Sequence, residues 1–186
     1  MCIRDRGIGP ADAVVCFAAH NLSYPHKGGA QLAEALGGIR YDGTLHLLTM
    51  GAGQFVAPAR FKHKHFGRIE SDQLQSLIYR SADVFVIPSL EEAFGQTALE
   101  AVACGALVAG FAVGGITDIV QNDLNGQLVA RGDSTALGQA ITSLLKNETL
   151  KSRWCSSCVG WVKEHFSFER NAVAYHELYK TLLAAP

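Results

Sequence analysis

Two glutamates, Glu92 and Glu100, stand eight positions apart across a junction between a predicted strand and a predicted helix. The strand ends at Pro88, and apolar spacing predicts a helix over residues 94–104. Backbone N–H groups that open a helix form an anion site, and Gly95 would let a phosphate or sugar approach the main chain. Carboxylates only accept hydrogen bonds, so beside an anion site they suit the vicinal hydroxyls of a ribose and a hexose. The alternative is that these acidic side chains only stabilise the helix N-terminus.

The elements that must position these side chains alternate between short apolar runs and amphipathic stretches. Near-continuous apolar runs occupy residues 13–19, 45–50, 84–88 and 107–113. Such runs are typical of strands buried on both faces, and helical spacing follows them. We therefore expect an α/β fold, a doubly wound parallel sheet of the Rossmann-like type. Ligands of such sheets bind beyond the carboxyl ends of the strands, here in the loops after Ala19, Gly51 and Pro88.

Polar residues mark two helix starts and one exposed strand. Asp72 with Gln75 predicts a capping box, and Asp133 with Ser134 predicts the cap of a later helix. Residues 62–65, Lys-His-Lys-His, predict the solvated face of an edge strand, because charge protects a sheet edge from pairing.

The bulk composition favours one globular domain. The chain has 186 residues, of which 48% are apolar and 18% charged, and its net charge is −1. No run of Lys or Arg stands out, so neither nucleic acid nor an anionic membrane surface is expected as a partner. No apolar stretch reaches the ~20 residues of a transmembrane segment. We assign residues 13–186 to the domain and residues 1–12 to a non-native or truncated start.

The chain has five cysteines, and their odd number and spacing do not predict a disulfide framework. Cys16 and Cys104 lie in apolar segments, as small core residues would. Cys155 and Cys158 form a C-x-x-C motif that is either a metal or redox pair or two residues on one helix face. This usage favours a reduced, cytoplasmic compartment.

The segment from Pro88 to Gly105 resembles the E-x7-E signature of retaining GT-B-fold glycosyltransferases of the group 1 type, with Glu92 and Glu100 as its glutamates. The flanks agree at Ala82-Asp83, Pro88-Ser89, Phe94-Gly95, Glu100-Ala101, Ala103-Cys104-Gly105, Gly114-Gly115, Asp118, Asn125-Gly126 and Asp133. The resemblance covers roughly residues 13–185. It implies that this single domain corresponds to the C-terminal, donor-binding half of a GT-B fold.

The resemblance also assigns roles to individual residues. Glu92 would contact hydroxyls of the donor sugar and Glu100 would hold the ribose. Lys27, in a Lys-Gly element, would stabilise charge on the leaving diphosphate, so Glu92 and Lys27 are the candidate catalytic residues. The remaining candidates for donor binding, several of them through the main chain, are Arg68, Ile69, Ala93, Phe94, Gly95, Gln96 and Thr97. Lys27 and Arg68 could instead be ordinary surface cations.

One feature departs from the family pattern in the loop after the first strand. The family carries an arginine before the Lys-Gly element, whereas this chain has His20, Asn21 and His26 upstream of Lys27. Either the loop aims the site differently or His20 partly substitutes for the arginine. The departure bears directly on affinity for the diphosphate and on activity.

The family and the absent motifs together define the expected ligands. The chain contains no D-x-D, so a nucleotide-sugar donor linked to UDP, GDP or ADP would bind without a metal ion or other cofactor. P-loop, G-x-S-x-G and G-x-G-x-x-G motifs are missing, which argues against phosphotransferases, α/β-hydrolases and dinucleotide dehydrogenases. The acceptor would bind an N-terminal domain that this chain does not contain, and a final helix over residues 168–183 would cross to it. The alternatives are a nucleotide-sugar-binding module without transferase activity and a flavodoxin-like domain without a ligand.

Overall fold

The computed structural model describes residues 8–9 and 11–184 of the chain and contains one six-stranded, fully parallel sheet. Its strands are β1 (Ala13–Asn21), β2 (Leu45–Ala52), β3 (Phe61–His65), β4 (Val84–Ile87), β5 (Leu107–Phe111) and β6 (Gly126–Val129). They lie in the order β3-β2-β1-β4-β5-β6. This is the order of a doubly wound, Rossmann-like sheet, so the predicted fold class is confirmed.

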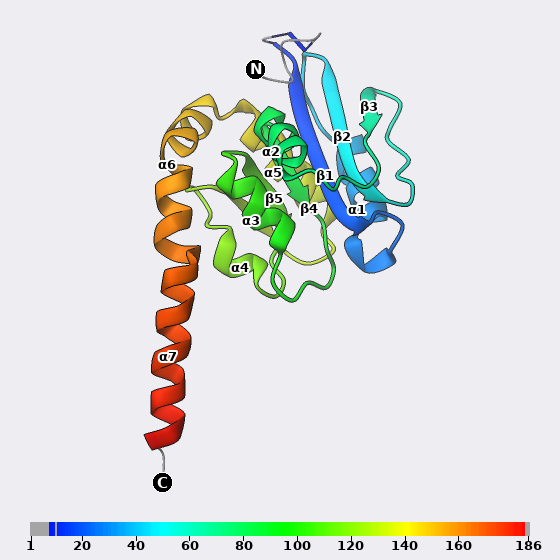
Figure 1. Cartoon of the computed structure of the whole chain (residues 1–186). Coiled ribbons are helices and arrows are strands. Elements are labelled where there is room, and N and C mark those ends of the chain that lie inside the picture. Colours follow the sequence, from blue (N-terminus) through cyan, green and yellow to red (C-terminus); the bar gives the residue numbers. More distant parts are fainter. Residues whose placement is uncertain (1–7, 10, 185–186) are drawn as a thin grey trace.

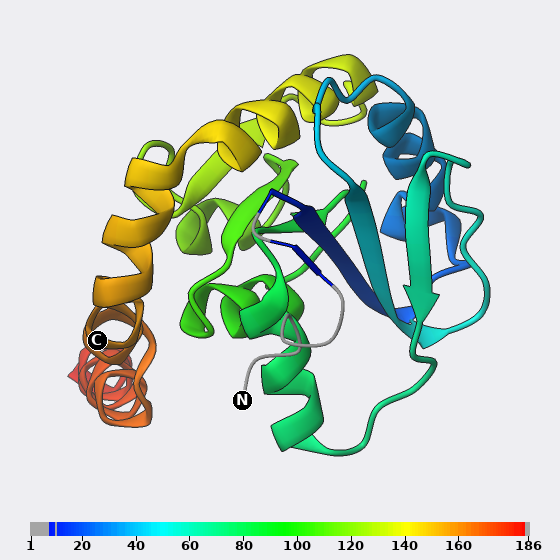
Figure 2. The same cartoon turned by 90° about the horizontal axis from the view of Figure 1, so that it is seen from above.

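Helices cover both faces of this sheet. The helical elements of the described residues are the 3-10 turn η2 (Pro25–Lys27) and the α-helices α1 (Gly29–Gly37), α2 (Asp72–Ser81), α3 (Gln96–Ala103), α4 (Ile116–Ile119), α5 (Ser134–Lys146), α6 (Glu148–Phe166) and α7 (Phe168–Ala184). Helices α1 and α5 pack together on one face, and α2 and α3 pack together on the other (Figure 2). The central strands are therefore shielded from water on both sides, which explains their unbroken apolar sequences.

The core consists of the strands and the inner faces of these helices. All of residues 13–19 in β1 are buried, and Phe17, Phe85 and Phe111 are each at most 1% exposed. A fully buried side chain of this size contributes about 2 kcal/mol to folding through the hydrophobic effect. Cys16 belongs to this core, and burial raises the pKa of its thiol well above the usual range.

The C-x-x-C motif lies on α6. The four cysteines among the described residues are free. Both Cys155 and Cys158 have their Sγ atoms close to Gly105, in the turn that follows α3. They share one helix face, as the second interpretation of the motif predicts. Among the described residues, no three His, Cys, Asp or Glu side chains are grouped in a way that could hold a metal ion.

Two of the predicted local signals need correction. Helix α3 begins at Gln96 rather than at Phe94, because Gly95 adopts the left-handed conformation (φ 97°) and forms the N-cap. The cap of α2 is Ser71, whose side chain accepts a hydrogen bond from the N–H of Leu74, so the predicted Asp72–Gln75 capping box is wrong. The cap at Asp133 is confirmed, since its side chain accepts from Ala136. Strand β3 is an edge strand with residues 62–65 exposed, as predicted.

Helix α7 extends away from the α/β body (Figure 1). None of its residues is buried. Its large exposed apolar side chains are Phe168, Val173, Tyr175, Leu178, Tyr179, Leu182 and Leu183. Within the described residues, no helix is both long and apolar enough to cross a membrane. Most of the predicted start, residues 1–12, lies outside the described residues.

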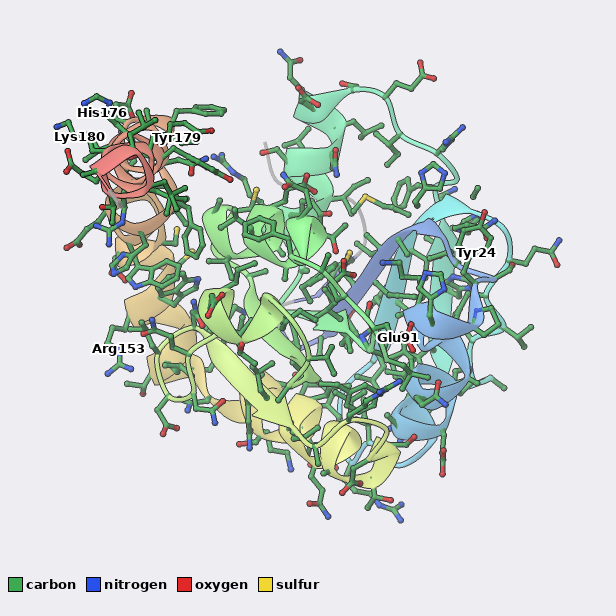
Figure 3. The ribbon with its side chains drawn as sticks, turned by 90° about the horizontal axis from the view of Figure 1, so that it is seen from below. Tyr24, Glu91, Arg153, His176, Tyr179 and Lys180 are labelled. Atoms are coloured by element: carbon green, nitrogen blue, oxygen red, sulfur yellow. The ribbon has the colours of Figure 1, made fainter. Side chains whose placement is uncertain are left out.

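The sheet has its topological switch point between β1 and β4, the two central strands. The chain leaves β1 towards β2 on one side and leaves β4 towards β5 on the other, so the loops that follow the two strands diverge. Figure 3 looks onto the carboxyl edge, with Tyr24 in the loop after β1 and Glu91 in the loop after β4. The predicted site residues come from these loops and their neighbours.

Candidate functional site

The loop after β1 and the loop after β4 are held against each other. The N–H of Leu90 donates to the carbonyl of His26 at 2.8 Å. Gly28 has a φ of 72°, and a side-chain carbon at this position would lie 1.7 Å from the carbonyl oxygen of Pro88. Only glycine permits this approach, because any other residue would be both strained and overlapping. The contact fixes Lys27, the preceding residue, beside the loop that carries Glu92.

Lys27 and Glu92 form an ion pair across these two loops. The Lys27 Nζ lies 2.7 Å from Glu92 Oε2, and the Ser89 hydroxyl donates to the same oxygen at 3.3 Å. The two side chains are about one fifth exposed, at 20% and 18%. The structure thus brings the two candidate catalytic residues into direct contact, each neutralising much of the other's charge.

The segment between Glu92 and α3 is seated on the turn after β5. The N–H of Gly115 donates to the carbonyl of Ala93 at 3.1 Å. The left-handed Gly95 caps α3 with no side-chain hydrogen bond, and the first intrahelical bond is made by Ala98 to the Gly95 carbonyl at 2.9 Å. The N–H groups of Gln96 and Thr97 precede that bond and are directed out of the helix N-terminus, as an anion site requires.

A cavity of about 280 Å³ opens beside the N-terminal half of α3. It is lined by Ala18, Ala19, His20, Met50, Gly51, Arg68, Ile69, Gln75, Thr97 and Glu100. These residues come from the ends of β1 and β2, the loop before α2, and helices α2 and α3. Four predicted donor-binding residues, Arg68, Ile69, Thr97 and Glu100, therefore share one cavity at the carboxyl edge of the sheet.

Glu100 is held by side chains of the neighbouring helix α2. Gln75 Nε2 and the Tyr79 hydroxyl both donate to Glu100 Oε2, at 2.9 and 3.0 Å, and Gln96 Nε2 donates to Oε1 at 3.3 Å. Burial, followed by the charge of Glu100, raises the pKa of Tyr79, so its hydroxyl keeps the proton that it donates. This role of Gln75 and Tyr79 was not predicted from the sequence. Their i,i+4 spacing, which places them on the same face of α2, is the signal that could have indicated it.

Arg68 reaches across the same cavity to the end of β1. Its Nη2 lies 3.2 Å from His20 Nε2. A guanidinium group only donates hydrogen bonds, so a ring nitrogen of His20 must accept. The contact with His20 therefore holds the Arg68 guanidinium group at this cavity.

Other predicted residues lie elsewhere. Lys27 and Glu92 do not line the 280 Å³ cavity. The side chains of Phe94 and Gln96 line a separate cavity of about 480 Å³ at the junction of α6 and α7, where the Phe94 ring packs edge-on against Phe166 at 6.3 Å. The predicted set therefore divides into an ion pair, a cavity around Glu100 and a loop whose main chain, rather than its side chains, lies between them.

Similarity to known proteins agrees with this arrangement. A family described as "Glycosyl transferases group 1" matches residues 12–147. The D-inositol 3-phosphate glycosyltransferase of Salinispora arenicola is 32% identical over 152 residues, covering 80% of this chain and 32% of that protein. The phosphatidyl-myo-inositol mannosyltransferase of Mycobacterium leprae is 31% identical over 141 residues, covering 72% of this chain and 37% of that protein.

Solved structures show the same fold. Anabaena HepE in complex with UDP and glucose matches with a TM-score of 0.72 at 19% identity, covering 94% of this chain and 49% of that one. The sucrose-phosphate synthase of Thermosynechococcus elongatus matches with a TM-score of 0.73 at 28% identity, covering 98% and 49%. This chain thus spans about half of these GT-B structures, and a smaller share of the two relatives above. The family match covers well over half of the chain, which therefore belongs to the group 1 glycosyltransferases.

Proposed function

We propose that residues 13–186 form the C-terminal, donor-binding domain of a retaining, metal-independent glycosyltransferase that transfers a hexose-type sugar. The observation that carries this proposal is the cavity at the switch point, where Glu100 and the N-terminus of α3 lie side by side. A carboxylate that accepts from vicinal hydroxyls, next to an anion site, matches the ribose and diphosphate of one nucleotide. The matched structures are about twice this length, which supports a further, N-terminal domain that binds the acceptor. The cysteine usage of the chain supports a cytoplasmic enzyme.

Each part of the donor has a group to receive it. Glu100 accepts from the ribose, and the main chain of Arg68 and Ile69 contacts the base. The diphosphate and sugar lie along the main chain of residues 93–97, at the positive end of the α3 dipole. Glu92, the first glutamate of the E-x7-E motif, orients the sugar hydroxyls. UDP-, GDP- and ADP-linked sugars all meet this description, and UDP or UDP-glucose occupies the Anabaena HepE structures.

Lys27 supplies the electrostatic component of the reaction. When the bond between the anomeric carbon and the diphosphate oxygen breaks, negative charge grows on the leaving nucleoside diphosphate. The ammonium group of Lys27 and the N–H groups opening α3 stabilise that charge without a metal ion. The acceptor hydroxyl then bonds through its oxygen to the anomeric carbon from the face that the diphosphate leaves and passes its proton to the departing diphosphate oxygen, so the configuration is retained. Arg68, brought to the cavity by His20, adds a second positive charge.

A second candidate function is a nucleotide-sugar-binding module without transferase activity. The absence of an arginine before the Lys27-Gly28 element favours it, because the loop then carries one fixed positive charge instead of two. Both functions need donor binding, so that step is the one to test first.

Binding of UDP, GDP and ADP to the 186-residue chain, measured by calorimetry, tests the proposal. We expect Glu100→Gln to lower the affinity for the tightest-binding of these nucleotides by about tenfold, because the ribose hydroxyls then donate to a neutral amide oxygen instead of a charged carboxylate. Glu91→Gln is the matched control, since Glu91 lies in the loop that leads from β4 to α3, its side chain is 74% exposed, and its ion pair among the described residues is with Arg131 at 3.3 Å. No saturable binding of any nucleotide, or the same loss in both variants, would contradict the proposed function.

A further inference from the structure

Glu100 is restrained on one of its two carboxylate oxygens. Gln75 and Tyr79, one turn apart on α2, both donate to Oε2, and Gln75 Nε2 also lies 3.4 Å from the Tyr79 hydroxyl. Within the part of the chain that the structure describes, Oε1 receives only the longer, exposed contact from Gln96. A ligand hydroxyl can replace that contact easily, whereas Oε2 is already saturated by two good donors.

The orientation of Glu100 matters because this side chain lies between two cavities. Gln75 and Glu100 line both the 280 Å³ cavity and a neighbouring cavity of about 350 Å³, whose other lining residues include Tyr79, Ser76 and Cys104. A glutamate without lateral restraint has several rotamers of similar energy. Here the hydrogen bonds from α2 select among them.

We propose that Tyr79 and Gln75 are positioning residues that fix Glu100 with Oε1 free for the ribose hydroxyls, which makes the chain selective for ribonucleotides over deoxyribonucleotides. This inference rests on the proposed function, because it takes Glu100 as the ribose ligand. Tyr79 does not line the 280 Å³ cavity and acts through the carboxylate, whereas Gln75 lines the cavity beside Glu100 and also restrains its carboxylate.

The surroundings of Tyr79 suit it to this role. It is 1% exposed, and its ring packs edge-on against Phe85 of β4 at 5.5 Å. The hydroxyl is therefore anchored to the sheet and has lost its rotational freedom before any ligand binds. Preorganisation of this kind lowers the entropic cost that binding would otherwise include.

The test compares a ribonucleotide with the same nucleotide lacking both ribose hydroxyls. The probes are UDP, GDP or ADP, whichever binds the wild type most tightly, and its 2′,3′-dideoxy form, measured by calorimetry. We expect Tyr79→Phe to lower the affinity for the ribonucleotide about fivefold and to leave the affinity for the dideoxy form unchanged. The substitution removes one hydrogen bond to the Glu100 carboxylate and keeps the aromatic ring. Tyr175→Phe, which removes an exposed hydroxyl on α7, is the matched control and should change neither affinity.

Glu100→Gln separates failure of the positioning role from failure of the proposed function. If Glu100→Gln lowers ribonucleotide affinity and Tyr79→Phe does not, Tyr79 has no positioning role, whereas the proposed function stands. If Glu100→Gln leaves the preference for the ribonucleotide intact, the ribose assignment itself is wrong. Equal weakening of both probes by Tyr79→Phe would show a packing role only and would overturn the inference.

Gln75→Leu keeps the inference testable if Tyr79→Phe does not fold. Gln75 lies at the surface of α2 and is only partly buried, so its replacement removes the donor to Oε2 without opening the core. The same selective loss of ribonucleotide affinity, about threefold, is expected. An unchanged ratio between the two probes in this variant contradicts the inference.

Discussion

The two glutamates of the candidate site are eight residues apart but are held in opposite ways. Glu100 accepts hydrogen bonds from the uncharged donors Gln75 and Tyr79, so its negative charge is oriented and not cancelled. Glu92 is paired with Lys27 at 2.7 Å, so both charges are partly cancelled. The nucleoside side of the site is therefore formed in advance, whereas the side for sugar and diphosphate holds its charges against each other until a donor separates them.

The energies allow Lys27 to exchange Glu92 for the diphosphate of a donor. An ion pair with side chains about one fifth exposed contributes of the order of 1 kcal/mol, because solvent screens it and both side chains lose freedom. A diphosphate carries more charge than one carboxylate and offers more acceptor oxygens to Lys27. We therefore expect the donor to take Lys27 from Glu92 at little cost, which frees Glu92 for the sugar hydroxyls.

The largest effect should follow from separating the two loops that carry this ion pair. Gly28→Ala places a carbon 1.7 Å from the Pro88 carbonyl oxygen at a φ of 72°, and should lower the free energy of unfolding by about 3 kcal/mol. Gly132→Ala is the control: its φ is 80°, but nothing lies within 4 Å, so about 1 kcal/mol is expected. Urea unfolding measures both. Equal losses would mean that the contact between the loops is not tight.

The fold was predictable because its determinants are local. The runs at β1, β4 and β5 are apolar at nearly every position, a pattern typical of short strands that are covered on both faces. The misplaced start of α3 has an equally local cause. Phe94 continues the apolar spacing of the helix, but the left-handed Gly95 separates it from the first turn.

The site was predictable only in part, because its contacts join distant residues. Lys27 and Glu92 are 65 positions apart, and the pair exists because the order of strands places β1 beside β4. The same holds for Gln75. Its spacing from Asp72 predicts a helix cap, whereas its hydrogen-bond partner is Glu100 on α3, 25 positions away. The assignments of Arg68 to the base and Glu92 to the sugar stay predictions.

Removing the positive charge on the diphosphate side should produce the next largest effect. We expect Lys27→Met to lower the affinity for the preferred nucleoside diphosphate by about tenfold and to leave the affinity for the parent nucleoside unchanged, because only the diphosphate interacts with the positive charge. Lys62→Met, on the exposed edge strand β3, is the control for a general change in net charge. Equal weakening of nucleoside and nucleoside diphosphate by Lys27→Met would contradict the assigned role.

The smallest effect distinguishes the two glutamates most directly. Glu92→Gln removes the carboxylate that competes for Lys27, so it should raise affinity for the nucleoside diphosphate about threefold, the value of a partly exposed ion pair. Glu100→Gln, in contrast, should lower the affinity for the nucleoside diphosphate. A higher salt concentration should reduce the effect of Glu92→Gln more than that of Glu100→Gln, because Glu92 is paired with a positive charge and Glu100 is not. Calorimetry at low and high salt measures both. A loss of affinity in Glu92→Gln would mean that Glu92 holds Lys27 in place for the diphosphate instead of competing with the diphosphate for Lys27. The two glutamates would then differ in their distance from the ligand and not in how their charges are balanced.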